Sequence, residues 1–308
     1  MKQPYDLAPD DRADESTRKI LRRLFGALLS NVDGVVEDAD TEFLHDLRVA
    51  NRRTRSALSQ IKGVLPTPDL ETFQPEFKWL GGVTGPCRDL DVFLTDLNTS
   101  RQQSGIDNTS LGPLEDFLSG NRRNEHGMVC AALQSERFLR LVQGWGRFLE
   151  PGGEKDAGPP LASSPIIQVA GARIFEAYRR MRKRGAGIDV DPPAALLHRL
   201  RIDGKKLRYL LEFFSDLYPR PTVTRFIREL KQLQDILGDF NDTQVQLGFI
   251  NDFKDLGNAS AETLAATHLL ASSITERQRQ LRSEFSERFE LFASEASRTL
   301  YRETFKAT

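Results

Sequence analysis

Apolar side chains recur every three or four positions along most of the chain, which is the spacing that gathers them on one face of an α-helix. The pattern is clearest over residues 223–251 and over residues 259–300, where leucine and phenylalanine alternate with charged side chains. No stretch shows the strict alternation of apolar and polar positions that is typical of a half-buried strand. The sequence therefore predicts an all-α protein.

Helix-breaking residues divide the chain near its middle. A stretch rich in proline, glycine and serine, EPGGEKDAGPPLASSP, occupies residues 150–165, and such clusters mark the connections between elements. We therefore expect a first helical half at 1–150, a linker at 151–165 and a second helical half at 166–308. Each half would hold about four helices.

A pattern of basic residues occurs twice in the chain. Residues 45–55 read H-x-L-R-x-x-x-R-R-x-R and residues 198–208 read H-x-L-R-x-x-x-K-K-x-R, so that the two copies lie 153 positions apart. An offset close to half the chain indicates an internal duplication. We predict two copies of one helical unit.

Two further pairs of positions support the duplication. Asp89 and Asp242 follow similar glycine-containing segments and are also 153 positions apart. The sequence Ser-Glu-Arg-Phe occurs at 135–138 and again at 286–289, with an offset of 151. We interpret it as a third echo of the same repeat.

Length and composition exclude several classes of protein. The chain has 308 residues, 39% of them hydrophobic, and a formal net charge of −1, which suits an ordinary globular protein. Its apolar runs are far shorter than the ~18 residues of a membrane-spanning helix, and the acidic N-terminus predicts no secretory signal. The two cysteines, Cys87 and Cys130, form no disulfide framework. We expect a cytoplasmic protein that does not enter a membrane.

The repeated motif places its basic residues on one stripe of a helix. At about 100° per residue, positions 0, 3, 7 and 10 of each copy share a face. The stripe carries no acid to pair with its cations, and like charges at this spacing destabilise an isolated helix. Since guanidinium groups hold phosphate oxygens bidentately, we interpret the two stripes as one groove for a polyanion. The stripe residues are His45, Arg48, Arg52 and Arg55, then His198, Arg201, Lys205 and Arg208, with Arg53 and Lys206 at the edges.

These motifs resemble those of the CHAD family, the conserved histidine α-helical domain. The resemblance covers nearly the whole chain and rests on HDLRVANRRTRSAL, GPCRDLDVFL, LHRLRIDGKKLRYLLEFF and LQDILGDFND. It implies two four-helix bundles, related by pseudo-twofold symmetry around a basic central channel, that together form one CHAD domain. It also implies non-catalytic binding of inorganic polyphosphate by the ten basic residues of the two motif copies, with no cofactor. The expected location is at polyphosphate granules in a prokaryotic cell.

Other basic residues are candidates for an extension of the polyanion path beyond the channel. They gather on the first helix of each predicted half, and their alternative role is that of charged helix ends, since cations favour helix C-termini. The candidates are Arg18, Arg22, Arg179, Arg180, Arg182 and Lys183.

The repeated acids Asp89 and Asp242 have two interpretations. They are either ligands of a Mg²⁺–phosphate complex, or helix N-caps and carboxylates that orient the basic residues. We favour the second, because a helix that starts near Gly85 would place Asp89 close to its N-terminus. His45 and His198, without further cysteine or histidine nearby, do not predict a metal site.

Two other functions stay open. An enzyme acting on polyphosphate or another phosphate polymer needs a positioned nucleophile or metal ions, whereas the stripes supply cations without carboxylates. No E-x-E-x-K motif of a triphosphate-tunnel catalytic domain is present. A nonspecific nucleic-acid-binding module would use the same groove, with nucleic acid as a competing polyanion. Tyr209 is the one aromatic residue near the polar side of the motifs, whereas single-strand sites stack bases on several aromatics. Protein partners stay unknown from the sequence.

Overall fold

The computed structural model describes residues 5–104, 110–150, 158–188 and 191–306. Within these ranges every element is a helix, and the one strand-like feature is an isolated bridge between Arg12 and Pro165. The predicted all-α class is therefore confirmed. None of the described helices is long and apolar enough to cross a membrane.

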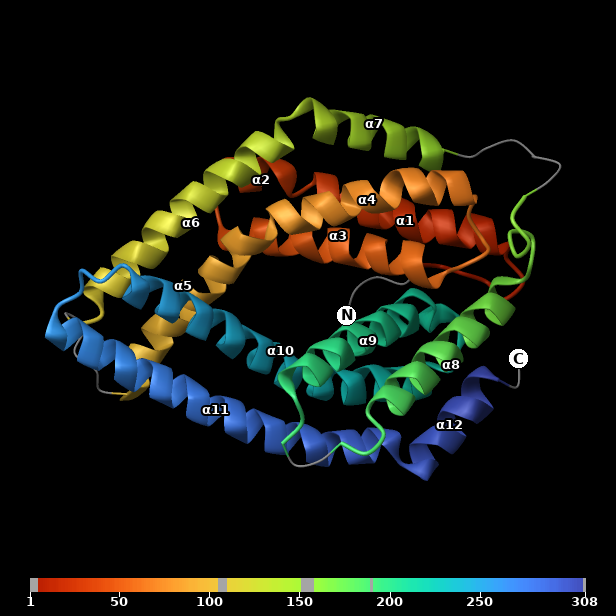
Figure 1. The fold of residues 1–308 in the computed structure, drawn as a ribbon. Helices are drawn as coiled ribbons and strands as arrows, with labels where there is room; N and C mark the ends of the chain where they lie inside the picture. Colours follow the sequence, from red (N-terminus) through yellow and green to blue (C-terminus); the bar gives the residue numbers. More distant parts are fainter. Residues whose placement is uncertain (1–4, 105–109, 151–157, 189–190, 307–308) are drawn as a thin grey trace.

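The first half contains more helices than the four that the sequence predicted. Its elements are α1 (Ala13–Leu29), α2 (Val32–Val36), α3 (Thr41–Gln60), α4 (Thr67–Val83), α5 (Gly85–Ser104), α6 (Gly112–Leu133) and α7 (Glu136–Leu149). The second half contains α8 (Ile166–Arg184), α9 (Ala194–Phe213), the short 3₁₀ helix η1 (Ser215–Leu217), α10 (Arg220–Asp255), α11 (Ala261–Ala293) and α12 (Glu295–Phe305). Figure 1 shows their arrangement.

Helix starts recur with the offset of the sequence motif. The first residues of α1 and α8, of α3 and α9, and of α4 and α10 are each 153 positions apart. The halves differ further along, because α4 and α5 are separated at Thr84 while α10 runs on as one helix. The division into two four-helix bundles with twofold symmetry stays a prediction.

The third echo of the repeat is wrong as a structural equivalence. Ser135 caps the N-terminus of α7, where its hydroxyl accepts a hydrogen bond from the backbone N–H of Phe138 at 3.2 Å. Ser286 instead lies inside α11 and donates to the carbonyl of Arg282 at 3.1 Å. The break that ends α11 is at Ser294, which caps α12. The helical pattern over 259–300 is therefore interrupted at Ser294 and forms two helices.

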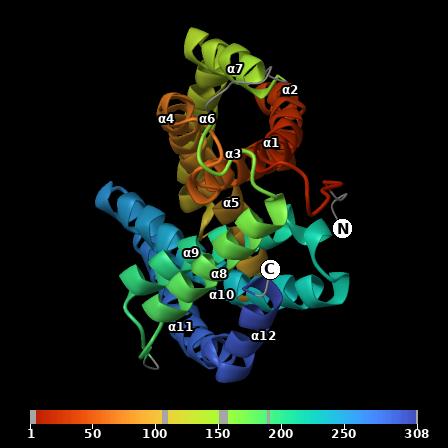
Figure 2. The ribbon, with the colours of Figure 1, turned by 90° about the vertical axis from the view of Figure 1, so that its right-hand side faces the viewer.

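The two halves share their buried apolar residues. One cluster extends from α1, α3 and α4 into α8, α9 and α10. A second cluster forms where the α5–α6 pair meets the α10–α11 pair, with Leu90, Phe93, Leu118, Ile250 and Phe253 at its centre. Figures 1 and 2 show these two pairs converging at one end of the molecule. The two halves therefore meet at two separate apolar clusters.

The predicted linker is described in part. Residues 151–157 lie outside the described residues, whereas 158–165 pack against the first half. The N–H of Leu161 donates to the carbonyl of Gly63 at 2.8 Å, and the N–H of Ala13 donates to the carbonyl of Ser164 at 3.0 Å. Gly63 has a φ of 78°, a left-handed conformation that glycine adopts without steric cost.

Candidate functional site

Helices α3 and α9 bring the two basic stripes together. Arg52 of α3 donates from Nε to the hydroxyl of Tyr209 on α9 at 2.8 Å, and Tyr209 is only 2% exposed. The charge of Arg52 contributes to lowering the pKa of both Arg201 and Lys205, after the larger effect of burial. We call Arg48, Arg52, Arg201 and Lys205 the central basic cluster.

Arg48 is anchored on the first-half side of this cluster. Its guanidinium donates to the hydroxyl of Thr84 at 3.0 Å and to the carbonyl of Gly81 at 3.2 Å. Burial lowers the pKa of Arg48 to about 10, although the charge of Asp89 acts in the opposite direction. The group is therefore fully charged at neutral pH but is held in poorly hydrated surroundings.

Arg201 and Lys205 form the second-half side of this cluster. Burial, reinforced by Arg201 and Arg52, lowers the pKa of Lys205 to about 6. The Nε atom of Arg201 is buried and has no hydrogen-bond partner among the described residues. A buried cation without a partner is costly, and an anionic ligand placed between the two helices would relieve that cost.

The repeated acids lie close to the cluster. Asp89 of α5 and Asp242 of α10 line a small cavity of about 10 Å³. Burial raises the pKa of Asp89, while Arg48 and Arg201 both lower it. Since α5 begins at Gly85, Asp89 stands one turn inside the helix, and its predicted N-cap role is wrong. Its position between arginines of both halves agrees with the other interpretation, a carboxylate that orients the basic residues.

The two edge residues of the motifs point away from the central cluster. Arg53 is only 5% exposed and forms an ion pair with Glu212 of α9. Its guanidinium also lies 5.2 Å from the ring centre of Phe213. Burial lowers the pKa of Lys206, which lies among Asp203, Arg180 and Arg184 on the side of α8. Arg53 therefore joins the two halves, and Lys206 faces a different helix.

The remaining stripe residues lie around the cluster with different exposure. Burial and the charge of Arg88 lower the pKa of His45, whereas His198 is exposed and has no hydrogen-bond partner in the described part of the chain. Arg55 is exposed and lies against Gly81, where an added Cβ would come within 2.7 Å of its guanidinium. Arg208 is 3.5 Å from Glu212. The two histidines thus do not occupy equivalent surroundings.

Arg18 and Arg22 are engaged by the end of α7, and their part in a polyanion path stays a prediction. Arg18 donates to the carbonyl of Phe148, and Arg22 donates to that of Leu149 at 2.7 Å. Both therefore complete hydrogen bonds at the C-terminus of α7, whose last carbonyls lack partners within the helix. This position of Arg18 and Arg22 at a helix C-terminus matches the alternative role, that of cations at helix ends.

The candidates on α8 line a different groove, between α8 and α12. Arg179, Arg182 and Lys183 lie there, and Arg180 also donates to Gln60 at 3.3 Å. The sequence did not point to the opposite wall of this groove, which is formed by Arg298, Arg302 and Lys306. Their spacing of four residues was the signal that could have revealed them.

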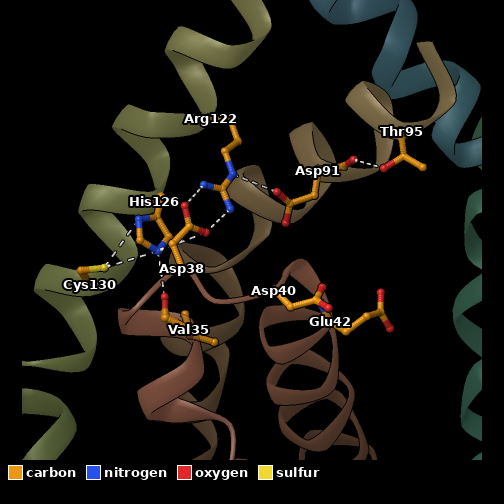
Figure 3. A network of polar contacts seen from close by, with 9 residues as sticks. All are labelled: Val35, Asp38, Asp40, Glu42, Asp91, Thr95, Arg122, His126 and Cys130. Carbon is orange, nitrogen blue, oxygen red and sulfur yellow. Dashed lines mark hydrogen bonds and ion pairs between the residues drawn. The ribbon is translucent and has the colours of Figure 1, made fainter. Parts of the chain in front are cut away.

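A polar network braces the start of α3. Figure 3 shows Arg122 of α6 between Asp38, which precedes α3, and Asp91 of α5. Its Nε donates to Asp91 at 3.0 Å, and the hydrogen bonds from Arg122 lower the pKa of Asp38. Asp38 has a φ of 51°. In the described residues no group of three or more histidine, cysteine or carboxylate side chains is placed to hold a metal ion.

Comparisons with known proteins place this arrangement among its relatives. A family model of the CHAD domain matches residues 19–251. The crystal structure of the CHAD domain from the plant Ricinus communis is 26% identical, with a TM-score of 0.77 over 94% of this chain and 95% of that one. PptA from Streptomyces chartreusis, at 18% identity, shares the fold with a TM-score of 0.71 over 91% of this chain and all of that one.

A curated relative is longer than this chain. An uncharacterized protein of Mycobacterium tuberculosis is 25% identical over an alignment of 254 residues that covers 77% of this chain. The chain spans about half of that relative, 45% of its length.

Proposed function

This chain belongs to the CHAD family, and on that premise we propose that it binds inorganic polyphosphate through the central basic cluster, without converting it chemically. CHAD domains are associated with polyphosphate binding, which makes this polymer the first candidate. The observation that carries the proposal is the convergence of like charges from α3 and α9. The charge of Arg52 on α3 lowers the pKa of both Arg201 and Lys205 on α9. Because these cations are close enough to affect one another, one ligand would contact both helices.

The finer architecture belongs to the same proposal. The recurrence of helix starts every 153 positions supports two related helical bundles, with the cluster in a channel between them. Phosphates of one chain would then meet Arg48 on one side and Arg201 on the other. A polymer suits this two-sided arrangement better than a single phosphate, because successive phosphates offer charge along a line. We also propose that this binding directs the protein to polyphosphate granules.

Binding requires no reaction step. Each phosphate would accept hydrogen bonds from guanidinium groups, which are stronger than bonds between neutral groups. Its charge would also favour the protonated form of Lys205, whose pKa of about 6 leaves it mostly neutral in the free protein at pH 7. The ligand therefore creates part of the positive charge that holds it.

Nucleic acid is the principal competing ligand, and the position of Tyr209 argues against it. This ring is buried and its hydroxyl is engaged by Arg52, so the ring offers no platform for a base. Single-strand binding draws much of its energy from such stacking. Cations alone would give only the sequence-independent attraction that any polyanion receives.

The experiment is a titration of long-chain polyphosphate over a range of salt concentrations, with duplex DNA as competitor. We expect affinity to fall steeply with salt and DNA to leave the bound polymer in place. Easy displacement by DNA would overturn polyphosphate as the ligand. Release of orthophosphate during incubation, above that of an Arg48→Ala/Arg201→Ala variant, would overturn the non-catalytic assignment and support an enzyme.

A further inference from the structure

A second basic surface lies away from the central cluster. The groove between α8 and α12 has a volume of about 1150 Å³. Its six principal cations are Arg179, Arg182, Lys183, Arg298, Arg302 and Lys306. Phe175, Ala186 and Ala293 provide apolar surface between them. Low-dielectric walls lined by charges of one sign concentrate the electric field in a groove.

Most of this charge is not neutralised by the protein. In the part of the chain that the structure describes, Arg179, Lys183, Arg302 and Lys306 form no ion pair. Glu176 is the acid that lines the groove, and it lies 3.2 Å from Arg173 and 3.9 Å from Arg180. Arg298 pairs at 3.1 Å with Glu295, a neighbour on its own helix, and Arg182 of α8 lies 4.0 Å from the same carboxylate. A solvated helix face usually interleaves opposite charges, and this surface does so only at its edges.

The two walls of the groove are fixed to each other by aromatic packing. Tyr178 of α8 stacks on Tyr301 of α12 with ring centres 3.9 Å apart and planes 9° from parallel. The hydroxyl of Tyr178 donates to the carbonyl of Phe292 at 3.4 Å. Figure 1 shows α12 alongside α8. The groove is therefore preformed, which reduces the entropy that a ligand must overcome.

The spacing of the cations indicates the shape of the ligand. Arg298, Arg302 and Lys306 follow one another at four-residue steps, so they extend over roughly 12 Å of α12. Arg179 and Lys183 face them from successive turns of α8. Two rows of positive charge along a trough fit a linear chain of negative groups better than one compact anion.

We propose that the α8–α12 groove is a second binding site for phosphate polymers, separate from the central basic cluster. The identity of the ligand rests on the proposed function, whereas the site itself rests on the charges described here. Arg180, hydrogen-bonded to Gln60 at the end of α3, lies among Lys206 and Arg184, so basic surface continues between the two sites. One long polymer would occupy both and gain from the high effective concentration of the second contact.

The test separates the two sites with paired substitutions. Tripolyphosphate and long-chain polyphosphate are titrated by calorimetry into the unaltered protein, Arg179→Ala/Arg302→Ala and Arg48→Ala/Arg201→Ala. The matched control is Arg123→Ala/Arg228→Ala, which removes two exposed arginines of other helices. For the groove variant we expect the loss of one tripolyphosphate site and about a tenfold weaker affinity for the long polymer.

The outcomes distinguish this inference from the proposed function. If Arg179→Ala/Arg302→Ala behaves like the control, the second site is overturned while the central one stands. If Arg48→Ala/Arg201→Ala binds normally and the groove variant does not, the central assignment fails and the groove is supported. Polyglutamate of matched charge is the remaining comparison. Tighter binding of polyglutamate than of polyphosphate in the groove would overturn the phosphate polymer as its ligand and indicate an acidic protein segment.

Discussion

The central cluster and the α8–α12 groove are both basic, yet their cations differ in how far they are exposed to water. In the centre, cations are half-buried between α3 and α9, close to Asp89 and Asp242, and burial lowers the pKa of Arg48, Arg201 and Lys205. In the groove, Arg179, Lys183 and Arg302 are exposed to water. An anionic ligand at the centre would offset the cost of holding these cations away from water, whereas a ligand in the groove would meet charges that water already solvates.

This difference determines how each site responds to its surroundings. Exposed charges are screened by salt over about 8 Å at physiological ionic strength, so the groove should contribute the salt-sensitive part of the affinity. Buried charges interact more strongly because water is excluded, and their protonation responds to the ligand. We expect the central cluster to determine which polyanion binds, and the groove to add contacts along a longer polymer.

The sharpest way to break the comparison is to remove two arginines from either site. Arg48→Ala/Arg201→Ala should weaken the binding of long-chain polyphosphate by about 100-fold or more, because each lost hydrogen bond to a charged group costs about 1.5–3 kcal/mol. Arg179→Ala/Arg302→Ala should cost only about tenfold. The measurement is competition binding at fixed salt, with thermal unfolding as the control for folding. Equal losses would show that burial does not distinguish the two sites.

A second prediction sharpens the comparison inside the motif itself. Arg53→Met should lower the free energy of unfolding by roughly 2 kcal/mol, because it removes the closer of the two arginines that pair with Glu212 and leaves Arg208 at 3.5 Å. Polyphosphate affinity of the folded protein should not change. The matched variant Arg52→Met should weaken binding and destabilise the fold less, since Arg52 bonds to a neutral hydroxyl. Urea unfolding and polyphosphate titration of both variants form the measurement, and a reversed pattern would contradict the placement of Arg53.

A third prediction uses pH to separate the sites. Bound phosphate raises the pKa of Lys205 from its value of about 6, so binding takes up a proton and affinity should fall by about tenfold from pH 6 to pH 8. Lys205→Arg stays charged and should flatten this dependence. Arg201, Arg52, Arg208 and Asp242 surround the lysine. A pH profile unchanged by Lys205→Arg would remove Lys205 from the site.

The same lysine makes the stability of the free protein depend on pH. Its pKa falls from an ordinary 10.5 to about 6 on folding. Between these values the unfolded chain binds a proton that the folded chain lacks, so the free energy of unfolding rises with pH. Below pH 6 both states hold the proton, and the contribution is constant. Lys205→Met should remove this slope in urea unfolding at pH 6, 7.5 and 9.

The smallest expected effect concerns the acids near each site. Asp89→Asn should weaken polyphosphate binding a few-fold, because the carboxylate lies close to both Arg48 and Arg201 and orients them. Glu176→Gln, at the exposed groove, should change affinity less than twofold since solvent screens its charge. Tighter binding by Asp89→Asn would mean that this carboxylate chiefly competes with the ligand for the arginines.

The sequence predicted those features that depend on spacing within a helix or on the repeat. Helical periodicity gave the all-α class, and the shared offset anticipated the matching starts of α3 and α9. It placed Arg52 on the basic stripe and Arg53 at the edge of that stripe, yet the family resemblance assigned both to polyphosphate binding. A rotation of about 100° on the helix sends one to the cluster and the other to Glu212.

Features formed by helices that are distant in sequence were harder to predict. Arg18 and Arg22 matched the idea of a basic path, but the open carbonyls at the end of α7 engage them. Arg298 and Arg302 are visible as a spaced pair, yet their role depends on α8 lying opposite. Packing, rather than residue type, assigns these cations to structure or to a ligand.

The apolar cluster between the α5–α6 pair and the α10–α11 pair also affects folding during synthesis. Leu90 and Phe93 of α5 are covered by Ile250 and Phe253 of α10, which leave the ribosome much later. At ~5–20 residues per second, the first half waits for roughly ten seconds before its covering helix exists. A neighbouring nascent chain offers a related surface during that time, and exchange of halves between copies is a common route to dimers. The chain must therefore be completed before two copies meet.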